Sequence, residues 1–244
     1  MLADVLPVLH TKIKNVNDRR YVTLADGRKK QITGAVTTEE AMRLAEVVLE
    51  RGCRNTLETG VAFGVSTLAI MLAFDALNDP GAVHYGVDPE QHTVHQGAAL
   101  ALQKEHGVSS RFELLEGPSH EILPVLLHRG VQLDFAFIDG WHTFDYTLLD
   151  FFYIDKMLRV SGVVAFHDSS WPSTRKVHGY LSTHRRYRLL PYPKATLVDS
   201  IRNALAFARN GKLDVGFILA RKANLLMFEK VEGWEPNHDY FVNF

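Results

Sequence analysis

The chain has 244 residues, of which 46% are hydrophobic and 23% are charged, and its formal net charge is -1. This composition is typical of a globular protein, and the length is enough for one large or two small domains. Because 27 basic residues balance 28 acidic ones, the net charge gives no reason to expect nucleic acid or an anionic membrane surface as a partner.

The expected cellular location follows from three further features. The single cysteine, Cys53, cannot form a disulfide within the chain, so the cysteine content does not indicate an oxidising compartment. The first residues include Asp4 and lack the long apolar run of a secretory signal peptide. No stretch reaches the ~18 apolar residues that a membrane-spanning helix needs. These features predict a cytoplasmic protein without a membrane partner.

Periodicity of the apolar residues divides the chain into regular elements. Residues 1–36 start with a helical apolar stripe and are expected to form an extension that packs on the core, acts as a lid over a ligand, or serves as an arm between the subunits of a homodimer. From residue 37 onward, helical and extended patterns alternate. The expected helices cover 37–53, 65–77, 92–106, 119–130 and 144–158, and the expected strands cover 55–60, 82–88, 111–117, 133–140 and 161–168.

Five strands that alternate with helices predict a doubly wound α/β fold, in which helices cover both faces of a mostly parallel sheet. Three later segments, 187–192, 214–222 and 225–231, also have strand-like patterns, and the last two could form a hairpin. We therefore expect a Rossmann-like sheet of seven strands with an antiparallel C-terminal strand or hairpin.

The expected domain covers 37–232, with a substrate-side insertion at 170–212 and an aromatic-rich tail at 233–244.

Ligands of open parallel sheets bind beyond the carboxyl ends of the strands. There the sequence has a glycine turn, Glu58-x-Gly60-x-x-x-Gly64-x-Ser66, which lets a ligand approach the main chain. Asp88 ends the second strand, and a carboxylate at that place suits the two hydroxyls of a ribose. The pattern indicates a nucleoside-containing ligand.

Three segments within residues 38–170 carry a further pattern. The first segment is the turn from Glu58 to Ser66, and the second is GPSHEILPVL at 117–126. The third comprises LDFAFIDGWHTFDY and the LLD that follows it, which include the end of strand four, together with GVVAFHDS, which includes the end of strand five. These segments resemble the class I S-adenosylmethionine-dependent methyltransferases, and among them catechol O-methyltransferase and related small-molecule O-methyltransferases. The resemblance implies the cofactor S-adenosyl-L-methionine, a divalent cation such as Mg²⁺ and a hydroxylated small molecule as substrate.

The same resemblance implies a role for each matching residue. His142 falls where the family has its catalytic lysine, and Asp139 would contact both metal and cofactor. Asp168 would be a second metal ligand, with Ser169 in the place of a family asparagine, which makes magnesium less certain because a hydroxyl is a poorer ligand than an amide oxygen. The implied cofactor contacts are Glu58, Gly60, Gly64, Ser66, Asp88, Gly117, Ser119, His120 and Asp139.

Electrostatics gives an independent expectation about Asp139 and Asp168. If strands four and five are neighbours, the two carboxylates lie on the order of 6 Å apart and repel each other by roughly 3 kcal/mol at an effective dielectric constant near 20. A divalent ion, the cofactor sulfonium, or a protonated His142 or His167 would relieve this repulsion.

The expected reaction is in-line transfer of a methyl group to an acceptor hydroxyl, with His142 either as general base or in a structural role. The acceptor could be an aromatic compound or a sugar. The rival interpretations are a nicotinamide-dependent oxidoreductase, a nucleic-acid or protein methyltransferase, and a non-catalytic scaffold that binds S-adenosylmethionine. The alanine at position 62 disfavours the first, since the dinucleotide fingerprint needs a glycine there.

Overall fold

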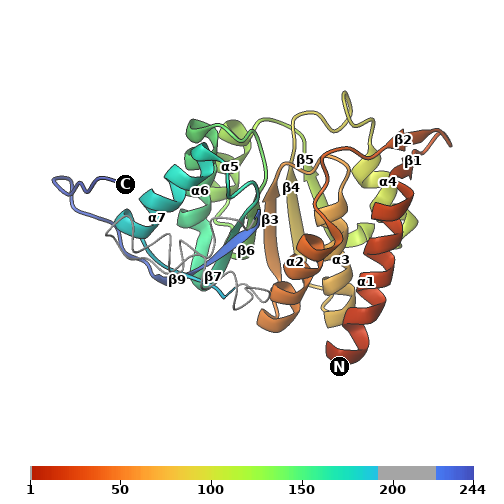
Figure 1. Ribbon diagram of the computed structural model, residues 1–244, viewed down its shortest axis with the longest axis horizontal. Coiled ribbons are helices and arrows are strands. Elements are labelled where there is room, and N and C mark those ends of the chain that lie inside the picture. Colours follow the sequence, from red (N-terminus) through yellow and green to blue (C-terminus); the bar gives the residue numbers. More distant parts are fainter. Residues whose placement is uncertain (1, 192–223) are drawn as a thin grey trace, which may run out of the picture.

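A computed structural model describes residues 2–191 and 224–244, and within these ranges a single seven-stranded sheet forms the centre of the molecule (Figure 1). The strands lie in the order β5-β4-β3-β6-β7-β9-β8. The first five strands of that order run parallel, and β9 runs antiparallel to both of its neighbours. The expected mostly parallel sheet with an antiparallel C-terminal strand is confirmed. The strands are β3 (Asn55–Thr59), β4 (Val83–Val87), β5 (Phe112–Leu115), β6 (Leu133–Ile138), β7 (Leu158–Phe166), β8 (Arg186–Leu189) and β9 (Leu226–Glu232).

Helices cover both faces of the sheet, as Figure 1 shows. On one face lie α1 (Leu2–Arg19), α2 (Thr38–Arg51), α3 (Val65–Leu77) and α4 (Ala98–Glu105). On the other lie α5 (Ser119–His128), α6 (Phe144–Met157) and α7 (Pro172–His184). Strand β6 divides its side chains between the two layers: Phe135 and Phe137 join the first core, and Ala136 and Ile138 join the second. This alternation explains why the strand is apolar from Phe135 to Ile138.

Several elements differ in extent from the sequence-based expectation. The helix expected over 92–106 begins only at Ala98, after a series of turns. Strand β7 covers 158–166, so His167 and Asp168 follow the strand instead of ending it. The strand-like segment 214–222 lies outside the described residues, while β9 pairs with β7 and β8.

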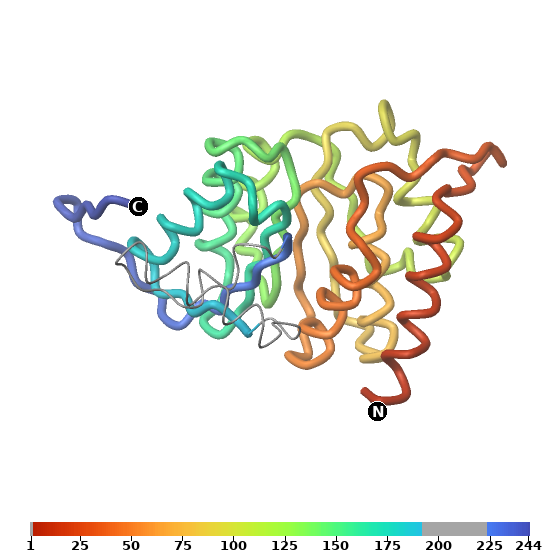
Figure 2. Tube along the Cα trace, in the orientation of Figure 1, coloured from red at the N-terminus to blue at the C-terminus, as the bar shows by residue number. Residues whose placement is uncertain are grey.

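The N-terminal residues are part of the main core. Helix α1 packs against α2 and α3 through Leu9, Ile13 and Val16, which are all buried. A two-stranded ribbon follows, formed by β1 (Tyr21–Thr23) and β2 (Lys29–Gln31). In the tube of Figure 2, α1 lies at the edge of the molecule opposite the C-terminal tail. Because α1 covers α3, whose residues 65–74 are all buried, its removal would expose a large apolar surface.

Helix α2 starts with a complete capping box. The Thr37 hydroxyl accepts a hydrogen bond from the Glu40 backbone N–H at 3.2 Å, and the Thr37 N–H donates to the Glu40 carboxylate at 2.8 Å. The helix ends at Gly52, whose φ of 57° is in the left-handed region.

A buried ionic cluster joins α6 to the last two strands. Asp155 on α6 accepts hydrogen bonds from Arg185 at 2.9 Å and from the Tyr187 hydroxyl at 2.7 Å, and Lys230 on β9 lies 3.1 Å away. The carboxylate, the guanidinium and the ammonium group are each less than 10% exposed. Burial and the Asp155 charge raise the pKa of Tyr187.

No helix among residues 2–191 and 224–244 is long and apolar enough to cross a membrane.

Candidate active site

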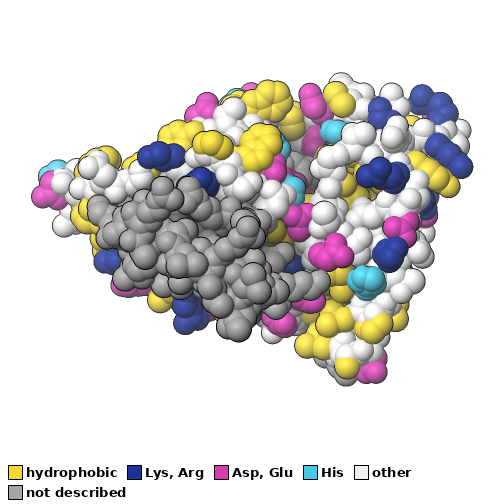
Figure 3. Space-filling model, in the orientation of Figure 1, with side chains coloured by type: hydrophobic (Ala, Val, Ile, Leu, Met, Phe, Trp, Pro, Cys, Tyr) yellow, Lys and Arg dark blue, Asp and Glu magenta, His cyan; other side chains and the backbone are white. Residues whose placement is uncertain are grey.

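A pocket of about 580 Å³ lies beyond the carboxyl ends of the parallel strands. Its walls are the loops that follow β3, β4, β6 and β7, together with the residues from Gly34 to Val36 before α2. On the face shown in Figure 3, acidic and histidine side chains gather in the upper middle of the molecule. Among the residues with implied roles, eight line the pocket: Gly60, Gly64, Ser66, Asp88, Ser119, Asp139, His142 and Asp168.

The two glycines of the first turn are required by packing within the protein. Gly60 has a φ of 83°, and a Cβ atom there would lie 2.1 Å from the carbonyl oxygen of Asp139. Gly64 has a φ of 77°, and its Cβ would lie 2.8 Å from the Cβ of Ala99. The turn thus lets β3 approach the end of β6 and lets α3 approach α4. Both glycines also line the pocket.

Glu58 lies outside the pocket lining, although the resemblance implies a cofactor contact. Its fully buried carboxylate accepts hydrogen bonds from the hydroxyls of Ser66, at 2.7 Å, and Thr67. His84 on β4 lies 3.2 Å away on the same side. Glu58 therefore holds the start of α3 against the sheet, and Ser66 directs its hydroxyl to that carboxylate.

Asp88 stabilises the glycine turn from the neighbouring strand. One carboxylate oxygen accepts the backbone N–H groups of Val61 at 3.0 Å and Ala62 at 2.8 Å, and the other accepts that of Glu90 at 2.8 Å. Asp88 lines the pocket but is only 4% exposed, whereas Glu90 beside it is exposed and also lines the pocket. The sequence analysis did not single out Glu90.

Of the three cofactor contacts expected from the segment GPSHEILPVL, which are Gly117, Ser119 and His120, only Ser119 lines the pocket. The ring of His120 faces the hydroxyl of Tyr146 at 3.3 Å, outside the lining. Gly117 has a φ of 159° and precedes the lining residue Pro118.

The sequence analysis missed Asp150, a buried acid on α6 that lines the pocket. It is 1% exposed, and one of its carboxylate oxygens has no hydrogen-bond partner. Burial raises the pKa of Asp150 to about 6, against the opposing contacts of Ser119 and Thr59. Asp150 lies inside an amphipathic helix pattern. The only signal in the sequence is an acidic residue at a position where the pattern predicts a buried side chain.

Replacing Asp150 with asparagine should change the pH dependence of stability. Because the folded pKa of about 6 exceeds the ordinary value of 3.8, the native state of the wild type loses stability as pH rises through this interval. We expect the wild-type and D150N proteins to have similar unfolding free energies near pH 4. At pH 7.5 the variant should be more stable, by on the order of 2–3 kcal/mol from ~1.4 kcal/mol per pKa unit. Urea unfolding at both pH values measures this, and a difference that does not vary with pH would contradict it.

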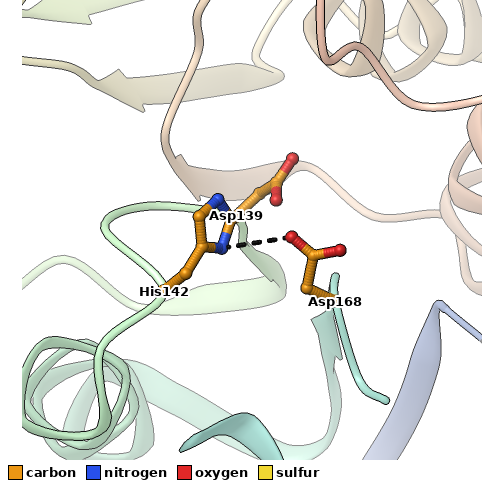
Figure 4. Close-up of side chains that lie close together, drawn as sticks. All are labelled: Asp139, His142 and Asp168. Carbon is orange, nitrogen blue, oxygen red and sulfur yellow. Dashed lines mark ion pairs between the residues drawn. The ribbon is translucent and has the colours of Figure 1, made fainter. Parts of the chain in front are cut away.

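Asp139, His142 and Asp168 come together at the base of the pocket (Figure 4). One ligand atom from each lies within 4.8 Å of the others, and Nδ1 of His142 is 3.4 Å from a carboxylate oxygen of Asp168. Both His142 and Asp168 adopt left-handed backbone conformations, with φ values of 49° and 46°. Such conformations cost energy in residues other than glycine and concentrate at functional sites.

Ser169, expected as a metal ligand, lies outside this cluster. Its hydroxyl donates to the carbonyl oxygen of Phe166 at 2.8 Å, and the residue is 2% exposed. The left-handed conformation of Asp168 turns the chain back, so that Ser169 lies beneath the strand end. His142 occupies the third position of the cluster in its place.

His167 supplies a positive charge beside the two aspartates. Its Nδ1 lies 2.9 Å from Asp139, and its Nε2 lies 3.5 Å from Glu40. Although burial opposes the charge, these contacts raise the pKa of His167 to about 10. A protonated His167 was one of the expected remedies for the repulsion between the aspartates.

The pKa values of the two acids beside His167 shift in opposite directions. The contact with His167 lowers the pKa of Glu40 to about 2 despite burial, whereas burial dominates at Asp139 and raises its pKa. The Glu40 carboxylate is therefore stabilised in its ionised form, whereas burial disfavours the ionised form of Asp139.

Comparison with known proteins agrees with this geometry. A family model described as a methyltransferase domain matches residues 57–169. Tapetum-specific methyltransferase 1 of Arabidopsis thaliana is 28% identical over 67% of this chain and 69% of its own length. Tricin synthase 2 of rice (Oryza sativa subsp. japonica) is 30% identical over 54% of this chain and 44% of its own, so this chain spans less than half of that relative. Caffeoyl-CoA O-methyltransferase of Mesembryanthemum crystallinum is 25% identical over 60% of this chain and 58% of its own.

Two solved structures share the fold at low identity. The O-methyltransferase TomG from Streptomyces achromogenes, crystallised with S-adenosylmethionine, gives a TM-score of 0.57 with 19% identity and covers 76% of this chain and 81% of its own. Cofactor-bound Rv0187 from MTB gives a TM-score of 0.63 with 15% identity over 92% of this chain and 90% of its own. With the strand order and the pocket, these comparisons show that residues 57–169 are similar to a methyltransferase domain and that the chain shares its fold with O-methyltransferases crystallised with S-adenosylmethionine.

Proposed function

We propose that the protein binds S-adenosylmethionine in this pocket and transfers its methyl group to a hydroxyl of a flat small molecule. The observation that carries the proposal is the convergence of Asp139, His142 and Asp168 at the base of a pocket that adjoins the Gly60 turn. Solved structures of this fold bound to S-adenosylmethionine or S-adenosylhomocysteine support the choice of cofactor.

His142 is our candidate for the general base. Its Nδ1 faces Asp168, which orients the ring and leaves Nε2 to accept the proton of the acceptor hydroxyl. The side chain is 36% exposed, so an acceptor can reach it. Most of the rate enhancement would come from holding the hydroxyl in line with the methyl group, since the effective molarity of a well-placed reactant is worth roughly 7–11 kcal/mol.

The three clustered side chains also fit a divalent cation. Two carboxylates and an imidazole are suitable donors, although the imidazole in place of an oxygen ligand favours ions such as Mn²⁺ or Zn²⁺ over Mg²⁺. Asp139, His142 and Asp168 would hold such an ion, which would lower the pKa of the acceptor hydroxyl and orient it. A neutral imidazole has only one unprotonated nitrogen. If that nitrogen of His142 binds a metal ion, it cannot also accept the proton of the acceptor hydroxyl, so the two roles exclude each other.

Exposed aromatic side chains beside the cluster favour a flat acceptor. Trp141 lines the pocket and is 67% exposed. Trp171 is 47% exposed, and its ring centre lies 5.3 Å from that of His142. Faces of this kind stack well on planar rings. The relatives named after caffeoyl-CoA, tricin and flavonoids are consistent with an aromatic acceptor.

Calorimetric titration of S-adenosylhomocysteine tests the proposal. We expect micromolar binding to chelator-treated protein and no binding of NAD⁺, which serves as the control ligand for the oxidoreductase alternative. Repeating the titration with Mg²⁺ and with Mn²⁺ tests the cation site, and tighter binding with Mn²⁺ is the expected order. Affinity that does not respond to either ion would leave His142 as the base without a metal. Failure of S-adenosylhomocysteine to bind under all conditions would refute the proposal.

A further inference from the structure

We infer that Glu40 is a positioning residue for methyl transfer, which acts by holding Asp139 in place through His167. The inference rests on the proposed function. Glu40 belongs to α2, outside the segment 57–169 that the methyltransferase family model matches. The assignment therefore depends on the contacts of Glu40 alone.

The three side chains form a continuous chain of contacts into the site. Glu40 lies 3.5 Å from Nε2 of His167, and Nδ1 of the same ring lies 2.9 Å from Asp139. Asn224 bridges Glu40 and His167, since its amide nitrogen donates to Glu40 at 3.2 Å and lies 2.9 Å from Nε2, to which it can donate when Nε2 is unprotonated. The imidazole is thus held on both edges, and its orientation fixes the carboxylate of Asp139.

Glu40 is itself rigidly placed. One of its oxygens accepts the backbone N–H of Thr37 at 2.8 Å and the Thr37 hydroxyl at 3.0 Å. The preceding residues Gly34 to Val36 line the pocket, and Asn17 on α1 donates to the carbonyl oxygen of Val36 at 3.2 Å. Glu40 therefore connects the part of the pocket wall before α2, formed by Gly34 to Val36, to the part after β7, which includes His167.

The burial of Glu40 exceeds what helix capping needs. A glutamate in a capping box satisfies one backbone N–H, and it can do so at the protein surface. Glu40 is only 7% exposed, and burying a carboxylate is costly unless a cationic or hydrogen-bonding partner compensates. His167 is that partner, and it links Glu40 to Asp139. The arrangement parallels the outer partners that orient ligating and catalytic side chains, whose loss costs about 10–100-fold in affinity or activity.

The Glu40→Gln variant tests the inference with little change in size. Glutamine can still form the capping box, but it lacks the negative charge that faces His167. We expect kcat to fall about 10–100-fold, with less than about a threefold change in the KM for the acceptor or in the Kd for S-adenosylhomocysteine. Glu39→Gln is the matched control, because Glu39 lies in the same turn of α2 but is exposed, and its kcat should equal that of the wild type.

Two more variants separate positioning from a structural role. Asp155→Ala disrupts the buried ionic cluster between α6 and the last two strands and should lower the thermal midpoint, while the folded protein keeps kcat within about twofold of the wild type, because Asp155 contacts neither Glu40 nor the pocket. The double variant Glu40→Gln/His167→Asn should have the same kcat as His167→Asn alone, because Glu40 acts through His167.

Three results would overturn the inference. The first is a kcat for E40Q equal to that of E39Q. The second is a double variant whose loss of kcat equals the product of the two single losses. The third is a kcat for the folded Asp155→Ala protein as low as that of E40Q. If the wild type binds S-adenosylhomocysteine and transfers methyl groups in these assays, only the role of Glu40 fails. If the wild type does neither, the proposed function fails as well.

Discussion

Replacement of Asp139 by alanine is expected to lower kcat by about 10³-fold, within the range for loss of a proton-transfer or charge-stabilising group. Asp139 contacts His167 at 2.9 Å and shares the cluster with His142 and Asp168, so its loss removes one carboxylate of the cluster and the contact that holds Nδ1 of His167. Steady-state kinetics with a methyl acceptor from the flavonoid or hydroxycinnamoyl class provides the measurement.

Asp145→Ala is the control for this experiment, because Asp145 is an exposed acid in the first turn of α6, close in sequence to the same loop. Its kcat should remain within about twofold of the wild type, since a surface substitution of this kind changes stability by only about 0.5 kcal/mol. Asp139→Asn distinguishes charge from shape, and we expect it to be as impaired as the alanine variant. Turnover by Asp139→Ala at the wild-type rate would show that the reaction takes place elsewhere.

Replacement of Asp155 by alanine should destabilise the protein by about 3–5 kcal/mol, the usual cost of removing one partner from a buried ion pair. Arg185 and Lys230 would then both be buried with like charges and without a carboxylate between them. Urea unfolding followed by fluorescence gives the change in free energy from the midpoint and slope.

The exposed pair of Lys14 and Asp18 on α1 provides the comparison for Asp155. Both side chains are more than half exposed, so Asp18→Ala should cost less than about 1 kcal/mol. Equal effects of the two substitutions would mean that the Asp155 cluster contributes no more than a surface pair does. Because the cluster is remote from the pocket, the folded D155A protein should keep its affinity for S-adenosylhomocysteine.

The sequence predicted the sheet well because its signals are local. The second halves of β6 and β7 are apolar on both faces, α2 has an amphipathic pattern that begins after its capping residue Thr37, and α3 is a long apolar run that begins after Gly64. The boundaries around Ala98 and Phe166 were less accurate, since turns and short extensions depend on tertiary contacts.

Site residues were predictable in position but not in direction. The sequence places Glu58 and Ser169 at strand ends and His120 at the start of a helix near the pocket, yet each side chain is directed to another residue of the protein and lies outside the pocket lining. Side-chain direction depends on backbone conformation, as the left-handed turn at Asp168 shows for Ser169. Glu40 and Asp150 were missed because they lie within helical patterns, where a buried acid differs from a surface acid only after the helices pack.

The packing of Gly60 and Gly64 bears on how related genomes should be searched. Because Gly60 leaves room for the Asp139 main chain and Gly64 for Ala99, a descendant that had lost its enzymatic activity would still need both glycines to fold. A search pattern built on this turn would collect active and inactive descendants alike. His142 and Asp168 contribute their side chains to the cluster with Asp139, so we expect these side chains to be lost first when turnover is no longer under selection. Pairing the turn with these two positions would make the pattern diagnostic of working enzymes.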